Sequence, residues 1–228
     1  MDTLFPEADL IALWITLKLA FVSTTVLLLI GIPLAWLFTF SRLQKFYFLQ
    51  LVFTLPIMLP PTVLGFYLLL LLSPESALGK LFQQVGLVAP AFHFSGLVIG
   101  SVLYSLPFVL QPIQNDFAKI SREILDAAAT LGAGKIDQFF SIGIPQAKNG
   151  ILTAAVLGFA HTRGEFGVVL MVGGNIPEKT KVLSIVIFEH VENLEYSMAH
   201  KLSFLLLAIS FSFLMVLYWI SKAKVKSD

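Results

Sequence analysis

The chain has 228 residues, of which 57% are hydrophobic and 13% charged, and its 15 basic and 14 acidic side chains leave a net charge of +1. This composition lies outside the soluble range and predicts an integral membrane protein, while the near-neutral charge gives no reason to expect nucleic-acid binding. The absence of cysteine excludes disulfides, thiolate metal sites and cysteine nucleophiles. We expect one all-α transmembrane domain over residues 1–228, with the lipid bilayer as its surroundings.

Five apolar stretches are long enough for the roughly 20 residues that a helix needs to cross a bilayer. Their approximate ranges are 10–40, 46–73, 94–117, 150–172 and 202–220. The second stretch contains Pro56, Pro60 and Pro61, which remove backbone donors, and we expect them to break or kink it near mid-depth. The apolar stretch 182–188 is too short to span.

The placement of lysine and arginine predicts an external amino terminus and a cytoplasmic carboxyl terminus, because cytoplasmic segments retain positive charge during insertion. In this orientation nine basic residues lie inside, namely Arg42, Lys45, Lys119, Arg122, Lys135, Lys148, Lys222, Lys224 and Lys226. Four lie outside, namely Lys80, Lys179, Lys181 and Lys201. Acids and no basic residues precede the first stretch, so we expect it to be an uncleaved first span. The polar segment 120–149 is then cytoplasmic.

No segment matches the nucleotide-binding loop, in which a glycine and four further residues precede Gly-Lys-Ser/Thr. The nearest segment, 77–81, lacks both the first glycine and the hydroxyl. We therefore expect that the chain is not an enzyme and does not hydrolyse ATP itself. The histidines at 93, 161, 190 and 200 show no metal-ligand spacing, so we expect neither a metal nor a cofactor.

The fourth apolar stretch carries His161, Arg163 and Glu165 near its middle. Charges at this depth are costly, so these side chains should face protein or water. On a helix His161 and Glu165 share a face, whereas Arg163 points elsewhere. Two interpretations stay open. Either these residues line a translocation path or gate together with Pro56, Pro60 and Pro61, or they form a fixed interhelical ion pair that orients packing.

The cytoplasmic segment begins with a predicted helix over 123–131, in which Ile124, Leu125, Ala128 and Leu131 share one face. Gly132 and Gly134 interrupt this helix, and a second short helix should end before Pro145. An apolar stripe of this kind fits a groove on another protein. An interfacial helix lying on lipid is the alternative.

The spacing within this segment is specific. Asp126-Ala127-Ala128 is followed after three residues by Gly132 and, nine residues later, by Ile142-Gly-Ile-Pro145. It resembles the EAA loop of ABC importer permeases, with aspartate for glutamate and Ile144 for leucine. The resemblance implies a type I importer permease fold with five transmembrane helices, and a loop that docks on a separate ATPase. The residues that it assigns to coupling are Glu123, Ile124, Leu125, Asp126, Ala127, Ala128, Leu131, Gly132, Ile142, Ile144 and Pro145.

Two further stretches, 55–65 and 163–180, resemble the molybdate permease branch, which is related to sulfate and tungstate permeases. Glu178 stands where many such permeases have glycine. The resemblance implies a homodimer in the bacterial inner membrane, served by cytoplasmic ATPase subunits and an external or periplasmic oxyanion-binding protein. ATP binding would act through residues 120–145 to turn the dimer from inward-facing to outward-facing. Molybdate is the expected cargo, with tungstate or sulfate as alternatives.

An ion-coupled secondary transporter is the rival from another class, with Glu165 and His161 as a proton relay. It predicts transport by the isolated chain without ATP. A membrane enzyme ranks last, because no nucleophile with a base and no metal cluster is recognisable in the sequence.

Overall fold

The structure is a computed structural model that describes residues 5–40 and 47–225. Its elements in chain order are α1 (Glu7–Phe40), α2 (Tyr47–Met58), α3 (Pro61–Leu72), α4 (Ala77–Gln84), α5 (Phe94–Phe117), α6 (Arg122–Thr130), α7 (Lys135–Gln138), the π-helical turn η2 (Phe139–Gly143), α8 (Ile144–Gln146), α9 (Lys148–Gly164), α10 (Gly167–Gly173), α11 (Leu183–Glu192) and α12 (Tyr196–Val225). No strand occurs in these residues, which confirms the all-α prediction for the part of the chain that the structure describes.

Three helices, α1, α5 and α12, are each long and apolar enough to cross a membrane. Two further spans form only if bent pairs are counted: α2 with α3, bent by 120°, and α9 with α10, bent by 61°. The first bend falls at Pro60 and Pro61, where proline was expected to break the span. The second bend, at Glu165 and Phe166, was not foreseen. The number of spans is therefore three to five, and five stays a prediction.

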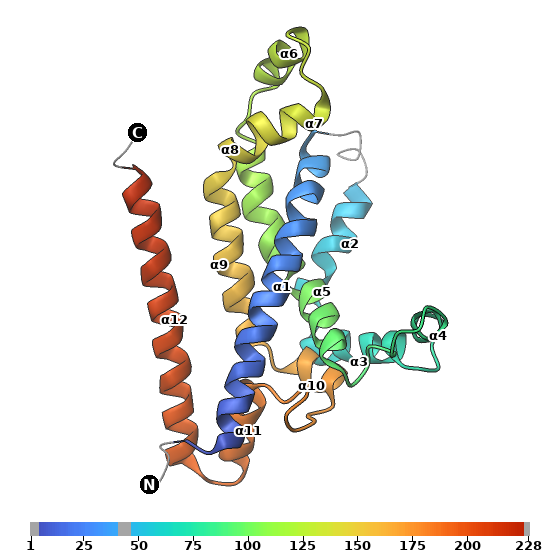
Figure 1. Cartoon of the computed structure of the whole chain (residues 1–228), viewed down its shortest axis with the longest axis vertical. Helices are drawn as coiled ribbons and strands as arrows, with labels where there is room; N and C mark the ends of the chain where they lie inside the picture. Colours follow the sequence, from blue (N-terminus) through green and yellow to red (C-terminus); the bar gives the residue numbers. More distant parts are fainter. Residues whose placement is uncertain (1–4, 41–46, 226–228) are drawn as a thin grey trace.

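The centre of the molecule is formed by α1, α5 and α9, which run side by side (Figure 1). Leu27, Val109 and Ala154, one from each helix, are fully buried in a common cluster. A Cβ atom on Gly158 would lie 3.0 Å from Val109 Cγ2, so glycine permits the close approach of α9 to α5. Helix α9 of this three-helix core carries His161 and Arg163, and Glu165 follows directly after it.

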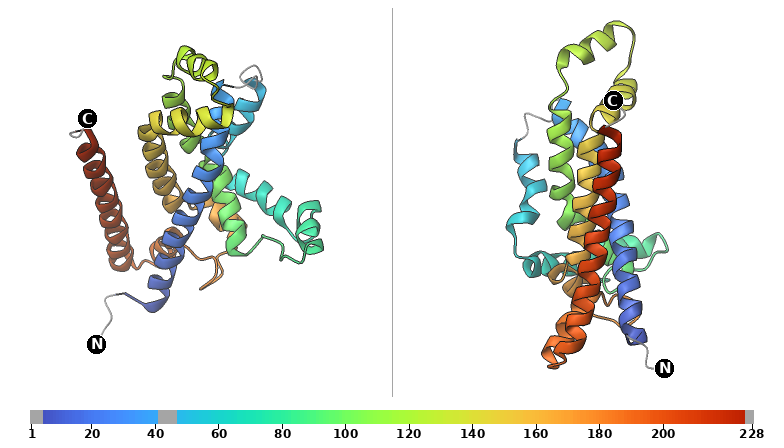
Figure 2. Two further views of the ribbon diagram at one scale, coloured as in Figure 1. Left: turned by 45° about the horizontal axis from the view of Figure 1, so that its top comes forward. Right: turned by 90° about the vertical axis from the view of Figure 1, so that its left-hand side faces the viewer.

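The ends of the bundle differ in what they carry. The helices α6 to α8 lie at the same end of the molecule as the carboxyl-terminal turns of α12, while α11 and the start of α1 lie at the opposite end (Figures 1 and 2). This arrangement is consistent with the prediction that the polar segment and the end of α12 lie on the same side of the membrane. The orientation itself stays a prediction, and its basic residues Arg42, Lys45 and Lys226 lie outside the described residues.

Candidate functional site

Segment 120–149, which the sequence predicts to be cytoplasmic, folds as α6, a glycine turn, and then the consecutive short elements α7, η2 and α8. Helix α6 ends at Thr130, and Gly132 then takes φ +93°, a backbone conformation that other residues rarely adopt. Gly134 has an ordinary φ of −73° and is the N-cap of α7. The two predicted glycine interruptions therefore have different roles, because the turn at Gly132 requires glycine and the position of Gly134 does not.

The apolar stripe of α6 is divided between the chain's own core and its surface. Leu125 is 9% exposed and packs into the core, whereas Ile124 is 44% and Leu131 90% exposed. Periodicity alone placed all of them on one surface offered to another protein. In the structure Leu125 packs against the chain's own core near the end of α1. Only Ile124 and Leu131 therefore remain exposed for contact with another protein.

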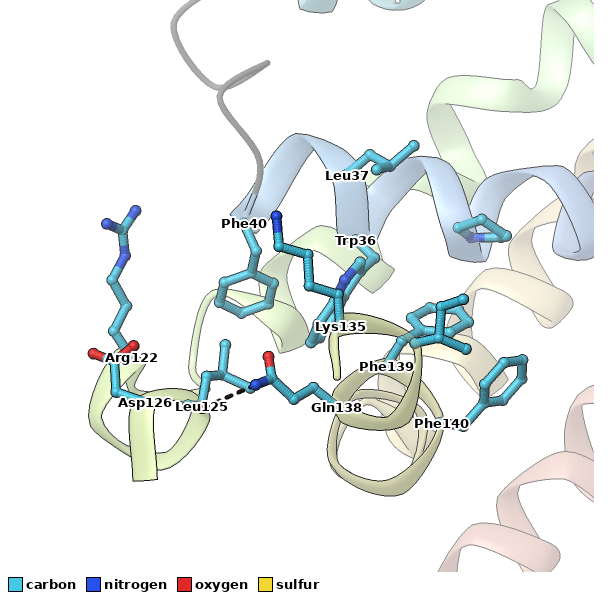
Figure 3. Close-up of a pocket in the computed structure, with 12 residues that line it drawn as sticks. Trp36, Leu37, Phe40, Arg122, Leu125, Asp126, Lys135, Gln138, Phe139 and Phe140 are labelled. Atoms are coloured by element: carbon cyan, nitrogen blue, oxygen red, sulfur yellow. Dashed lines mark hydrogen bonds between the residues drawn. The ribbon is translucent and has the colours of Figure 1, made fainter. Parts of the chain in front are cut away.

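The segment is fixed to the membrane core through aromatic contacts. Trp36 of α1 packs edge to face with Phe117 and Phe139, with ring centroids 5.2 and 5.5 Å apart. A Cβ atom on Gly143 would lie 2.6 Å from the Trp36 ring, so η2 lies directly on α1. The Gln138 side chain donates to the carbonyl of Leu125, which ties α7 to α6 (Figure 3). It also donates to the carbonyl of Ala133. The segment is therefore in direct contact with α1.

An open groove of about 640 Å³ lies between this segment and the end of α1 (Figure 3). Four aromatic residues, Trp36, Phe40, Phe139 and Phe140, are part of its mainly apolar lining, and Lys135 and Asp126 also line it. Phe140 is 60% exposed. The groove and the exposed stripe residues give this end of the molecule an apolar surface that is uncovered in the single chain.

The second polar site lies at the break between α9 and α10. Glu165 follows the last turn of α9 in an extended conformation and is 5% exposed. Its carboxylate accepts hydrogen bonds from Ser101 (2.5 Å) and Ser105 (3.1 Å) of α5. Its backbone carbonyl accepts from the Ser184 hydroxyl of α11 at 2.6 Å. One residue thus joins the broken helix to two other elements.

His161, one helical turn before Glu165, joins the hydrogen-bond network that Glu165 forms with Ser101 and Ser105. Its Nδ1 lies 2.8 Å from the Ser105 hydroxyl and 3.7 Å from Glu165 Oε1, and its ring stacks on Phe108 with centroids 4.1 Å apart. Helical spacing predicted correctly that His161 and Glu165 lie together. A hydroxyl shared between an imidazole and a carboxylate can orient both groups.

A cavity of about 480 Å³ opens beside this network. Its lining includes Pro61, Thr62, Tyr104, His161 and Glu165. A Cβ atom on Gly167 would lie 2.8 Å from Pro61 Cβ, so the starts of α3 and α10 meet here. Both broken helices thus converge on one cavity, which is apolar over most of its lining and carries the polar groups of Glu165 and His161. Irregular backbone that lines a cavity is an arrangement found along paths through a membrane.

The structure brings together only part of the predicted path. Pro61, His161 and Glu165 line the same cavity, whereas Pro56, Pro60 and Arg163 are not among its lining residues. The Nε and Nη1 atoms of Arg163 are buried without a hydrogen-bond partner in the described residues. Since Glu165 is held by two serines, the geometry does not favour an Arg163–Glu165 ion pair.

Sequence reasoning missed Ser101 and Ser105. The available signal was two hydroxyl residues four apart in an apolar stretch, which places both on one helix face. Among residues 5–40 and 47–225 there is no group of three histidine, cysteine or acidic side chains that could hold a metal ion.

An apolar helical bundle in which two broken helices meet at one cavity, and in which a loop at one end has an uncovered apolar surface, is typical of the membrane-embedded subunit of a transporter. A solved structure described as an amino acid ABC transporter has this fold, with a TM-score of 0.64 and 19% identity over 95% of this chain and 94% of that one. The chain belongs to the family of binding-protein-dependent transport system inner membrane components, whose model matches residues 15–225.

Individual relatives narrow the branch of this family. The chain is 50% identical to the molybdenum transport system permease protein ModB of Azotobacter vinelandii, over 93% of this chain and 94% of that protein. It is 30% identical to the putative molybdenum transport system permease protein YvgM of Bacillus subtilis, over 92% and 91% of the two chains. It is also 30% identical to the sulfate transport system permease protein CysT of Salmonella typhimurium, over 86% and 70%. The resemblance to the molybdate and sulfate permeases is confirmed.

Proposed function

We propose that this chain is the transmembrane subunit of an ATP-driven importer of a tetrahedral oxyanion, and that the oxyanion is molybdate. The observation that carries the proposal is the 50% identity to ModB across nearly the full length of both chains. Sulfate is the second candidate, because the permease CysT matches at 30%. Tungstate stays a third, since its ion has the same charge and tetrahedral shape as molybdate.

The cytoplasmic segment is the proposed contact with a separate ATPase subunit. Its exposed apolar residues Ile124 and Leu131 and its aromatic groove are the surface that such a subunit would cover. Its contacts with Trp36 would carry a movement of the ATPase into the bundle. The segment has the EAA spacing and is therefore the coupling loop of the proposed importer, over residues 120–149.

The complete importer in this proposal contains a second copy of the chain, cytoplasmic ATPase subunits and an external oxyanion-binding protein, in the inner membrane of a bacterium. The family's dependence on a binding protein supports the external partner. The cavity beside Glu165 and His161 is the proposed part of the translocation path in each copy. Two copies would enclose a path that one chain leaves open at its side.

Reconstitution into proteoliposomes tests the function. The chain with its ATPase subunit and binding protein should accumulate labelled molybdate only when ATP is present on the ATPase side. Competition with tungstate and sulfate ranks the three ions, and inhibition by sulfate alone would overturn the choice of molybdate. Uptake by the isolated chain without ATP would overturn the importer and favour an ion-coupled transporter.

A matched pair of glycine variants tests the coupling loop. Gly132→Asp should abolish ATP-driven uptake, because aspartate cannot adopt φ +93° without strain, while insertion into the membrane remains intact. Gly134→Asp adds the same charge two residues away, at an N-cap position where aspartate is favoured. It should therefore keep uptake near the wild-type rate. Equal loss in both variants would show that added charge, and not loop conformation, is responsible.

A further inference from the structure

Helix α9 begins without a capping side chain of its own. The first amides of a helix lack partners inside it, and the N-cap side chain usually accepts one of these hydrogen bonds. The N-cap of α9 is Ala147, whose side chain has no acceptor. The missing acceptor comes from another helix, because the Gly150 amide donates to Oδ2 of Asp116, in the last turn of α5.

The two helices meet closely at this point. A Cβ atom on Gly150 would lie 2.6 Å from the Pro112 carbonyl oxygen and 2.8 Å from Asp116 Oδ2, so only glycine fits. The Asp116 side chain is 11% exposed, and its other oxygen accepts from Lys119. A carboxylate beside the first turn of a helix is also favoured by the helix dipole. We call this contact the Asp116–Gly150 clasp.

The clasp closes the base of the coupling loop. Asp116 and Gly150 are 34 positions apart, and all of α6, α7, η2 and α8 lies between them. In Figure 1 this excursion stands at the end of the bundle, above the adjacent ends of α5 and α9. Because its two ends are joined, the loop cannot pull on α9 without also pulling on α5.

We propose that Asp116 is a positioning residue for energy coupling: its clasp makes α5 and α9 follow the coupling loop as one body when the ATPase moves it. The inference rests on the proposed importer function. Without the clasp, movement of the loop is absorbed between the two helix ends, and the cavity that α5, α9 and α10 share no longer opens in step with ATP hydrolysis.

The direct test compares uptake with hydrolysis in the reconstituted importer with its ATPase and binding protein. In Asp116→Ala the number of ions taken up per ATP hydrolysed should fall about tenfold, because a tenfold change corresponds to the loss of about one charge-assisted hydrogen bond. The rate of hydrolysis should stay near that of the wild type. Asp116→Asn keeps an acceptor oxygen and should retain most of the coupling. Lys119→Met removes only the exposed ion pair and should behave as wild type.

A distance measurement adds a readout that a purely structural role would not change. The chain has no cysteine, so Asn115→Cys and Asn149→Cys, next to the clasp residues and both exposed, can carry a spin-label pair. The short distance within one chain should stay the same with and without ATP. In the Asp116→Ala background it should broaden or change when ATP binds.

Three results would overturn the proposal. They are a wild-type ratio of uptake to hydrolysis in Asp116→Ala, an equal fall of both rates with a lower melting temperature, and an unchanged spin-label distance in that variant. If Asp116→Ala does not assemble, Asp116→Ser is used with the same expectations, because its hydroxyl is one bond too short to reach Gly150. Failure of the importer function itself is distinguishable, since the wild-type complex would then show no ATP-dependent uptake.

Discussion

Helices α5 and α12 are both long and apolar, yet they are held in the molecule in opposite ways. In the most apolar window of α5, 56% of the residues are buried, against 11% for α12. Polar contacts at two depths join α5 to helix α9 and the residue that follows it. One contact is at Glu165 and the other is the Asp116–Gly150 clasp. The difference shows that α5 is buried against α9 and joined to it by polar contacts, whereas α12 leaves most of its described side chains exposed.

Among the described side chains, the contacts of α12 are concentrated near the end at which the helix starts, and few lie farther along it. Phe213 meets Phe159 of α9 with ring centroids 4.3 Å apart. Just before α12 begins, Glu195 contacts His190 of α11, which in turn contacts Asp9 of α1. The helix is thus anchored where it starts, whereas the α5–α9 seam is joined at two depths, at the Asp116–Gly150 clasp and, beside the cavity, at Glu165.

The largest effect is expected from opening the seam at Glu165. Glu165→Ala removes the acceptor of two buried serine hydroxyls, and we expect a loss of about 2–4 kcal/mol in the free energy of unfolding. Unfolding in mixed micelles measures this loss. Glu165→Gln keeps the size and an acceptor oxygen and should lose less than half as much. A Glu165→Ala protein as stable as wild type would contradict the view that the seam depends on this contact.

Two glycines of α9 provide a smaller and better-matched test. Gly150→Ala places a methyl group 2.6 Å from a carbonyl oxygen in the seam, which should cost about 1–3 kcal/mol. Gly164→Ala adds the same group where no atom lies within 4 Å, and its effect should stay within about 0.5 kcal/mol. The same unfolding measurement applies to both. Equal destabilisation would mean that packing in the seam does not determine the result, because alanine in place of glycine is favoured by helix propensity and cannot by that route destabilise either variant.

The α12 side should respond less. Phe213→Ala removes the ring contact with Phe159 and should cost about 1 kcal/mol. Phe211, two residues earlier, is 61% exposed, and Phe211→Ala in the single chain should change stability by less than about 0.5 kcal/mol. Should Phe211→Ala prove the more damaging in the assembled importer alone, the exposed face of α12 would be assigned to the second copy.

The sequence predicted the parts of this comparison that depend on local pattern. Apolar length located the helices, proline marked the break before α3, and four-residue spacing brought His161 to Glu165. The break after Gly164 was missed, because glycine within a transmembrane stretch is common and no proline is present. The stripe on α6 was predicted as a face, but periodicity does not say which chain covers it, so the burial of Leu125 came only from the structure.

The clasp could not be predicted in any comparable way. Asp116 and Gly150 are far apart in sequence, and neither stands in a recognisable motif. Their contact depends on how closely α5 approaches α9, which is set by packing along the whole seam. The aspartate at the end of an apolar stretch would by itself be read as a solvated residue at the membrane surface.

The smallest expected effect concerns the anchor of α12, and it depends on pH. Partial burial by itself lowers the pKa of His190, but hydrogen bonds and charge from Glu195 and Asp9 outweigh it and raise the pKa above its ordinary value of 6.5. A raised pKa in the folded protein stabilises the fold fully below pH 6.5, and this contribution is lost as the pH rises through the folded value. The anchor should therefore weaken in alkaline solution.

His190→Gln isolates this contribution, because glutamine does not titrate. The melting temperature of the wild-type protein should exceed that of the variant near pH 6, and the difference should shrink toward about pH 9. Glu189 does not interfere: burial raises its pKa, but Lys181 and Asn175 outweigh this and lower it below 4.5, so its contribution is constant over this range. A difference that is independent of pH would mean that His190 anchors α12 by packing alone. The charges of Glu195 and Asp9 would then contribute nothing to this anchor.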